Sequence, residues 1–218
     1  MKIFVDFDDV LFNTAKFIQD FKRVFARYGV SAQLFNKSYV DYPIRRRGQK
    51  LKKYDPWVHF QKLQQAGIDS APIENDIRAL LSDTRRYVFP EAKRFLKTLG
   101  KQNIMVVSYG ETKFQHFKIQ NSGIAELTKK VFVTDRMKSS AIGKIIGKRG
   151  AQLDELIVFL DDRVEQLTNV KQKFPQVVTF LVKKRAGRYN DKKNKYCDFE
   201  IKTLWQAANR IKKIVSQQ

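Results

Sequence analysis

The segment KIFVDFDDVLFNT, residues 2–14, decides the fold of this chain. Its apolar run Ile3, Phe4 and Val5 leads directly into Asp6, and Asp8 follows two residues later. A short, continuous run of β-branched and aromatic residues is typical of a strand that is buried on both faces of a parallel sheet. We therefore expect a central strand here, with carboxylates at its carboxyl end.

Four further apolar runs of this kind follow along the chain, at residues 104–107, 131–133, 156–160 and 177–182. Helical patterns lie between or after them, at residues 90–99, 113–120, 139–148, 163–174 and 199–215. Strands that alternate with helices predict a doubly wound α/β fold with a parallel sheet and right-handed crossovers.

The alternation is interrupted after the first strand. Between residues 14 and 87 no strand-like run of similar quality occurs, and helices are expected at residues 14–28, 56–65 and 73–81. We therefore expect an α-helical cap subdomain at residues 14–87, inserted into a core domain formed by residues 1–13 and 88–218.

Polar side chains stand at the ends of the predicted strands, where open α/β sheets bind their ligands. They are Asp6, Asp8, Ser108, Asp135 with nearby Lys138, Asp161 and Asp162. Carboxylates crowded at one edge raise each other's pKa unless a cation lies between them. A hard divalent cation with oxygen ligands, most simply Mg²⁺, would resolve this conflict.

Four of these strand ends, taken in order, resemble the four motifs of the haloacid dehalogenase superfamily. The residues concerned are DFDDVLFNT (6–14), the hydroxyl-bearing end of IMVVSYGE (104–111), Lys138 just before a helix, and LIVFLDD (156–162). The inserted segment is similar to the helical cap of one class of these enzymes. The resemblance implies a Rossmann-like core and Mg²⁺-dependent hydrolysis of a phosphate ester through an aspartyl-phosphate.

The resemblance also implies a role for each motif residue. Asp6 would be the nucleophile, and Asp8 the acid for the leaving alkoxide and then the base for water. Ser108 would bind a phosphoryl oxygen, and Lys138 would offset the charge of the transition state. The expected metal ligands are Asp6, the backbone carbonyl of Asp8, Asp161 and Asp162, the last directly or through water.

One competing motif points to RNA. GKRG, residues 147–150, looks like the Gly-x-x-Gly loop of a KH module, which clamps a nucleotide backbone. A KH fold needs its own strands and helices, however, and the strand at residues 156–160 is better used in the larger sheet. The alternative is a helix that ends at Gly147, followed by a loop.

The strong positive charge of the chain is compatible with more than one function. Lysine and arginine number 43 against 22 aspartate and glutamate, a formal net charge of +21, which attracts polyanions. Two basic clusters stand out, and their candidate polyanion contacts are Arg45, Arg46 and Arg47 in the first and Lys183, Lys184 and Arg185 in the second. These clusters form a solvated surface, a nucleic-acid contact, or an attractive field for a phosphorylated metabolite.

Several classes of protein are excluded. The one cysteine, Cys197, rules out a disulfide framework and a cysteine-based zinc site, and two histidines, His59 and His116, rule out a histidine-rich metal centre. No apolar run approaches a membrane span, and the first residues do not resemble a signal peptide, so we expect a cytosolic protein without a membrane partner.

The expected function is a phosphatase acting on a small phosphorylated metabolite or nucleotide. The alternative is a nucleic-acid-binding protein or a nucleic-acid end phosphatase, and the oligomeric state is left open.

Overall fold

A six-stranded parallel sheet forms the centre of the molecule. The computed structural model describes residues 1–39, 41–46, 49–147 and 155–217. Across the sheet the strands run in the order β5-β4-β1-β6-β7-β8, and every neighbouring pair is parallel. The bounds are β1 Lys2–Val5, β4 Ile104–Tyr109, β5 Lys130–Thr134, β6 Ile157–Asp161, β7 Val178–Val182 and β8 Phe199–Ile201. The predicted α/β fold is confirmed, with β1 next to the middle of the sheet.

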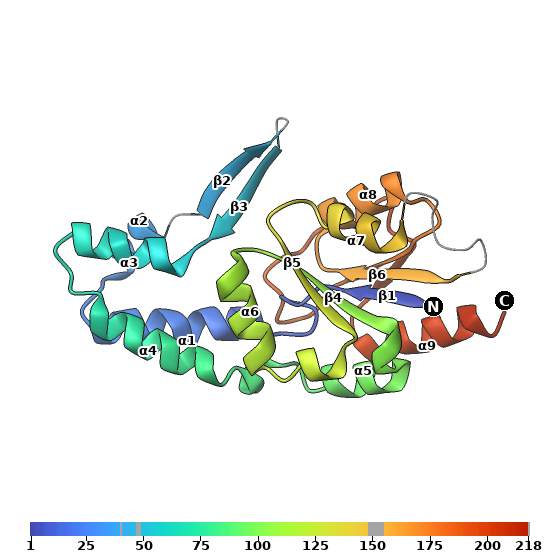
Figure 1. The fold of residues 1–218 in the computed structure, drawn as a ribbon, viewed down its shortest axis with the longest axis horizontal. Coiled ribbons are helices and arrows are strands. Elements are labelled where there is room, and N and C mark those ends of the chain that lie inside the picture. The colour runs from blue at the N-terminus through green and yellow to red at the C-terminus, as the bar shows by residue number, and fades with distance from the viewer. Residues whose placement is uncertain (40, 47–48, 148–154, 218) are drawn as a thin grey trace.

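Helices cover both faces of this sheet (Figure 1). One face carries α7 (Ser139–Ile146) and α8 (Val164–Lys173), and the other carries α5 (Ala92–Leu99), α6 (Thr112–Asn121) and α9 (Leu204–Val215). Alternate residues of β1 enter the two resulting cores, because Ile3 and Val5 pack on one side and Phe4 packs on the other. Burial on both faces explains why this strand is continuously apolar.

The inserted segment differs from the all-helical expectation. Its helices are α1 (Thr14–Arg27), α2 (Ala32–Ser38), α3 (Pro56–Gln65) and α4 (Ala71–Ser82), of which three match predicted helices. The prediction that it contains no strand was wrong, since β2 (Asp41–Arg46) and β3 (Gln49–Tyr54) form an antiparallel hairpin. The hairpin rises from the cap in Figure 1. A two-stranded ribbon needs no continuous apolar run, so these residues lack the sequence pattern of a buried strand.

The last predicted helix was also too long. Residues 199–201 form β8, and α9 begins only at Leu204. The side chain of Thr203 accepts a hydrogen bond from the Gln206 backbone, and the Gln206 side chain caps the Thr203 backbone in return. This capping box fixes the start of the helix. Short 3₁₀ helices occur at Arg85–Tyr87, Lys101–Asn103 and Ala125–Leu127.

The glycine motif at residues 147–150 does not build a separate RNA-binding fold in the part of the chain that is described. Helix α7 ends at Gly147, which has φ +82°, and Lys148, Arg149 and Gly150 lie outside the described residues. The strand that follows, β6, lies between β1 and β7 in the main sheet. Among the described helices, none is both long enough and apolar enough to cross a membrane.

Candidate active site

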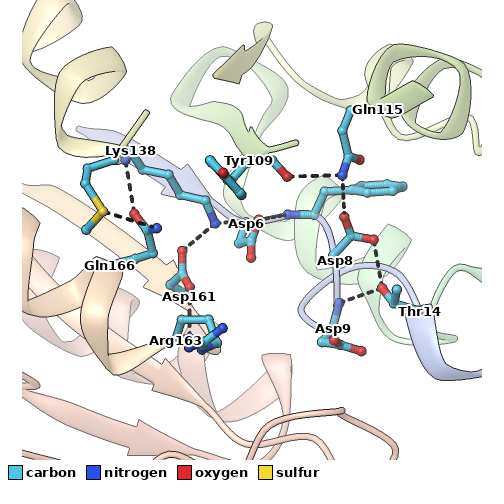
Figure 2. A network of polar contacts seen from close by, with 12 residues as sticks. Asp6, Asp8, Asp9, Thr14, Tyr109, Gln115, Lys138, Asp161, Arg163 and Gln166 are labelled. Atoms are coloured by element: carbon cyan, nitrogen blue, oxygen red, sulfur yellow. Dashed lines mark hydrogen bonds and ion pairs between the residues drawn. The ribbon is translucent and has the colours of Figure 1, made fainter. Parts of the chain in front are cut away.

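Parallel pairing brings two acidic strand ends together. Val5 of β1 is in register with Leu160 of β6, and the Asp6 N–H donates to the Leu160 carbonyl. Asp6 and Asp161 therefore leave the sheet side by side at its carboxyl edge (Figure 2). Asp162 joins them, and one carboxylate oxygen from each of the three buried residues lies within 4.8 Å of the others.

Lys138 crosses from the start of α7 to this acidic cluster. Its Nζ lies 2.7 Å from Asp6 Oδ1 and 2.6 Å from Asp161 Oδ2, and only 3% of the side chain is exposed. Burial lowers the pKa of Lys138, but the charges of Asp161 and Asp6 outweigh this, and the pKa is raised above its usual value. The backbone N–H of Lys138 donates to Gln166 Oε1 at 3.0 Å, which fixes the start of the helix. Lys138 therefore lies between the acidic ends of β1 and β6 and contacts both.

The single charge of Lys138 does not neutralise the three carboxylates of the acidic cluster. Burial raises the pKa of Asp6 to about 7, with Lys138 opposing the shift and Asp161 adding to it. Burial, followed by the charges of Asp6 and Asp161, raises the pKa of Asp162 well above its usual range. Asp162 Oδ2 is buried and has no hydrogen-bond partner among the described residues. Three converging carboxylates with an unpartnered oxygen fit a hard divalent cation, which takes oxygen ligands.

Asp8 is held in a different environment. Lys118 Nζ lies 2.7 Å from its Oδ1 and 3.0 Å from its Oδ2, Thr14 Oγ1 donates to Oδ1 at 2.7 Å, and Gln115 Nε2 donates to Oδ2 at 2.9 Å. Burial raises the pKa of Asp8, but the charges of Lys118 and Arg188 prevail and lower it to about 2. The Asp8 carboxylate is therefore ionised in this arrangement.

Lys118 was not anticipated from the sequence. It lies on the buried face of α6, and its Nζ lies 5.2–5.7 Å from the centroids of four phenyl rings, those of Phe7, Phe12, Phe17 and Phe114. An ammonium group gains cation–π attraction at such distances. The signal in the sequence is a lysine four residues after Phe114 in a predicted helix, a spacing that places the two on one face.

Arg188 was not predicted as a site residue either, although it lies three residues after Arg185 of the second basic cluster. Its Nε lies 2.6 Å from Oδ2 of Asp9, which is fully buried and has φ 57°. Left-handed backbone is uncommon outside glycine. Because Asp9 comes directly after Asp8, its contact with Arg188 connects the loop between β7 and β8 with the segment that carries Asp6 and Asp8.

The other residues predicted from the sequence differ in how near they lie to the acidic cluster. Ser108 lies near the end of β4, fully buried, and its Oγ has no hydrogen-bond partner among the described residues. Its neighbours Tyr109 and Gly110 line a cavity at the carboxyl edge of the sheet, whereas Ser108 and Asp135 do not. His59 is buried and stacks on Phe25, as expected for a core histidine.

The expected polyanion contacts do not line the cavity among the described residues. Arg45 and Arg46 belong to β2, and Arg47 lies outside the described residues. Lys184 forms an ion pair with Glu91, Lys183 Nζ lies 3.9 Å from Glu200, and Arg185 is exposed.

Core and cap together enclose a cavity of about 570 Å³ above the acidic cluster. The core contributes charged groups, among them Asp6, Asp8, Lys138 and Arg188. The cap contributes an aromatic wall made of Phe17, Phe21, Phe35, Tyr39 and Tyr54. A cavity of this size accommodates a small organic molecule, with its charged group toward the sheet.

Comparisons with known proteins bear on the fold. No protein-family model and no curated protein matches the chain. Among solved structures, a haloacid dehalogenase-like hydrolase from Burkholderia xenovorans LB400 has a TM-score of 0.73 at 16% identity, covering 97% of this chain and 96% of that one. A HAD-hydrolase from Bacillus subtilis bound to magnesium has a TM-score of 0.57 at 16% identity, covering 97% and 98%. The L-2-haloacid dehalogenase from Xanthobacter autotrophicus has a TM-score of 0.61 at 14% identity, with the same coverage.

Proposed function

Because the chain has the fold of the haloacid dehalogenase-like hydrolases, we propose that it hydrolyses phosphate monoesters in the cytosol, with Mg²⁺ as its cofactor. The observation that carries this proposal is the buried cluster of Asp6, Asp161 and Asp162 with Lys138. A nucleophilic carboxylate, a metal site and a fixed cation are the groups that phosphoryl transfer requires.

In the first step, a carboxylate oxygen of Asp6 attacks phosphorus. The ester bond to the leaving oxygen breaks, an aspartyl-phosphate forms, and the leaving alkoxide takes the proton of a protonated Asp8. The Phe7 N–H donates to Asp6 Oδ1 at 2.7 Å, and Lys138 contacts the same oxygen. These two contacts fix the carboxylate before the substrate arrives.

In the second step, water attacks the phosphoenzyme and Asp8 takes its proton. The bond between phosphorus and Asp6 breaks, which releases inorganic phosphate and restores the Asp6 carboxylate. An ionised Asp8 suits this base role. To act as the acid in the first step Asp8 must first take up a proton, and its contacts with Lys118 oppose this.

The metal would be held by Asp6, Asp161, Asp162 and the backbone carbonyl of Asp8. When bound, Mg²⁺ offsets the repulsion between these carboxylates and the phosphate dianion. The ammonium group of Lys138 places a fixed positive charge next to the phosphoryl group. Ser108 is not assigned to the phosphoryl group, because it is fully buried and does not line the cavity.

A panel of phosphate esters tests the proposal. We expect the wild type to release phosphate from p-nitrophenyl phosphate and from a set of phosphorylated metabolites and nucleotides, and to lose this activity with EDTA. Equal inactivity of the wild type and of Asp6→Asn across the panel would overturn the enzyme assignment. A protein that binds nucleic acid without turnover would then be favoured.

Dehalogenation is a second candidate, because the solved neighbours include an L-2-haloacid dehalogenase with chloropropionic acid covalently bound. The acidic cluster disfavours it here. A halide leaves without being protonated and without help from a metal, so dehalogenation gives no task to Asp8 or to the acidic cluster completed by Asp161 and Asp162. Release of chloride from 2-chloropropionate, without phosphate release from any ester, would reverse this preference.

A further inference from the structure

The cap side of the cavity is a surface of aromatic rings. Apart from Thr14, the described cap residues that line it are Phe17, Ile18, Phe21, Phe35, Tyr39 and Tyr54. The rings of Phe35 and Tyr39 stack with their centroids 5.4 Å apart, and those of Tyr39 and Tyr54 stack at 4.4 Å. Tyr54 in turn meets the edge of Phe114, a cavity residue of α6, at 5.7 Å. A ligand that fills this side of the cavity therefore meets a continuous aromatic surface.

Two hydroxyl groups of this surface already have partners. Thr14 Oγ1 donates to Asp8 Oδ1 at 2.7 Å, and the hydroxyl of Tyr54 lies 2.9 Å from Nδ1 of the buried His59. Burying a hydroxyl group without a hydrogen bond is costly. A sugar placed against this wall would give up its hydrogen bonds to water and would not regain them from these two groups. An apolar ring has no such bonds to lose.

The side-chain amides on the core side are engaged as well. Gln115 Nε2 donates to Asp8 Oδ2 at 2.9 Å and to the Tyr109 carbonyl at 3.1 Å (Figure 2). Gln166 Oε1 accepts from the backbone N–H of Lys138 at 3.0 Å. These amides hold residues of the site in place, so these groups do not replace the water that a sugar would lose.

The core adds an exposed ring to the same cavity. Tyr189, which lines the cavity, is 39% exposed, and the guanidinium carbons of Arg163 and Arg188 lie 4.0 Å and 5.1 Å from its ring centroid. Nε of Arg188 is paired with Asp9 at 2.6 Å. Aromatic side chains therefore line the cavity from both the cap and the core.

These observations indicate one kind of leaving group. Aromatic rings attract one another beyond the area they bury when their centroids lie about 4.5–7 Å apart. The cavity of about 570 Å³ has room for a ring in addition to the phosphate. We propose that this site hydrolyses small phosphate esters whose leaving group carries an apolar aromatic ring, in preference to sugar phosphates; this inference rests on the proposed function.

The test compares phosphate esters of primary alcohols, so that the leaving oxygen is alike in all of them, with the Mg²⁺-loaded protein. The substrates are benzyl phosphate, cyclohexylmethyl phosphate, ribose 5-phosphate, glucose 6-phosphate and adenosine 5′-monophosphate. We expect kcat/KM for benzyl phosphate to exceed that for either sugar phosphate by at least about tenfold, because the sugar hydroxyls are left without partners. It should exceed that for cyclohexylmethyl phosphate, which is apolar but not aromatic, by about twofold to tenfold. Adenosine 5′-monophosphate, which joins a ring to a hydroxylated ribose, should rank below benzyl phosphate.

Two leucine variants provide the matched control. Phe35→Leu removes a ring of the cavity wall, and Phe25→Leu removes a buried ring that lies 5.0 Å from Phe35 but does not line the cavity. The measured quantity is the ratio of kcat/KM for benzyl phosphate to that for cyclohexylmethyl phosphate, which does not depend on the fraction of protein that is folded. We expect the ratio to fall about twofold or more in Phe35→Leu and to stay unchanged in Phe25→Leu.

The possible failures are separable. Equal kcat/KM for benzyl phosphate and a sugar phosphate, or for benzyl and cyclohexylmethyl phosphate, would overturn this inference while leaving phosphatase activity intact. A preference for adenosine 5′-monophosphate over benzyl phosphate, or the same change of the ratio in both variants, would also overturn it. No turnover of any ester, p-nitrophenyl phosphate included, would instead overturn the proposed function.

Discussion

The ion pair between Lys118 and Asp8 shows how single side chains set the chemistry of this site. Lys118 is 2% exposed, and its charge lies among phenyl rings that offer no hydrogen bonds. Burial alone lowers its pKa, and Asp8 is the partner that opposes this loss of charge. A buried pair of this kind contributes little net stability, yet breaking it is costly because one charge is left uncompensated.

We therefore predict a large penalty for removing the lysine. Lys118→Met leaves the Asp8 carboxylate without its ion pair and should lower the free energy of unfolding by about 3–5 kcal/mol in urea denaturation. The double variant Lys118→Met/Asp8→Asn should recover part of this loss, since no charge then remains unpaired. Additive losses in the double variant would contradict the pairing.

A second residue-level prediction concerns the nucleophile. Asp6→Asn should reduce kcat for p-nitrophenyl phosphate by at least about 10⁴-fold, because the amide does not form the phosphoenzyme. Circular dichroism should show an unchanged fold. Asp135→Asn is the matched control, since Asp135 follows a strand but does not line the cavity. A similar loss of activity in both variants would remove Asp6 from its assigned role.

At the scale of elements, one buried histidine joins three parts of the cap. Ser38 of α2 lies 2.9 Å from Nε2 of His59, which belongs to α3, and the hydroxyl of Tyr54 at the end of β3 lies 2.9 Å from Nδ1. Burial, followed by the charge of Lys62, lowers the pKa of His59 to about 4. The neutral ring thus holds Tyr54 in the cavity wall.

This histidine predicts a pH dependence of stability. The folded-state pKa of about 4 lies below the unfolded value near 6.5, so the unfolded chain binds more protons between these values. His59 should therefore cost roughly 1–3 kcal/mol of stability as the pH falls from 6.5 to 4. Urea denaturation at pH 7 and at pH 4.5 should show that the free energy of unfolding falls less between these pH values in His59→Phe than in the wild type. Equal losses would show that His59 does not titrate in this way.

The capping box of α9 gives a prediction that leaves the site untouched. Thr203→Ala removes the acceptor for the Gln206 N–H and should lower the free energy of unfolding by about 1 kcal/mol. Thr203→Ser keeps the hydroxyl and should stay near the wild type. Phosphatase activity should be unchanged in both, and an equal loss of stability in the two variants would argue against the cap.

At the scale of the whole molecule, the overall charge and the local charge have opposite signs. The chain carries +21, yet the carboxyl ends of β1 and β6 gather more acids than cations. The carboxylates there are Asp6, Asp8, Asp9, Asp161 and Asp162, and among the described residues the cations in direct contact with them are Lys118, Lys138 and Arg188. One divalent cation would balance the two charges that remain.

Mg²⁺ should therefore stabilise the fold as well as support turnover. At 100 times its dissociation constant, a ligand that binds only the folded state adds about 2.7 kcal/mol. We expect Mg²⁺ to raise the melting temperature of the wild type, and to have a much smaller effect on Asp161→Asn. NaCl at equal ionic strength is the control. An equal rise in both proteins, or with NaCl, would place the metal elsewhere.

The sequence alone determined the α/β core and the order of its motifs, because strands buried on both faces must be continuously apolar and their polar ends follow directly. It indicated Asp6, Lys138 and Asp161 as residues that meet, and the register of β1 with β6 brings them together. The hairpin, β8, Lys118 and Arg188 were decided only by the tertiary structure. A ribbon or a three-residue strand lacks an apolar signature, and a lysine or arginine shows its partner only when distant segments pack against each other.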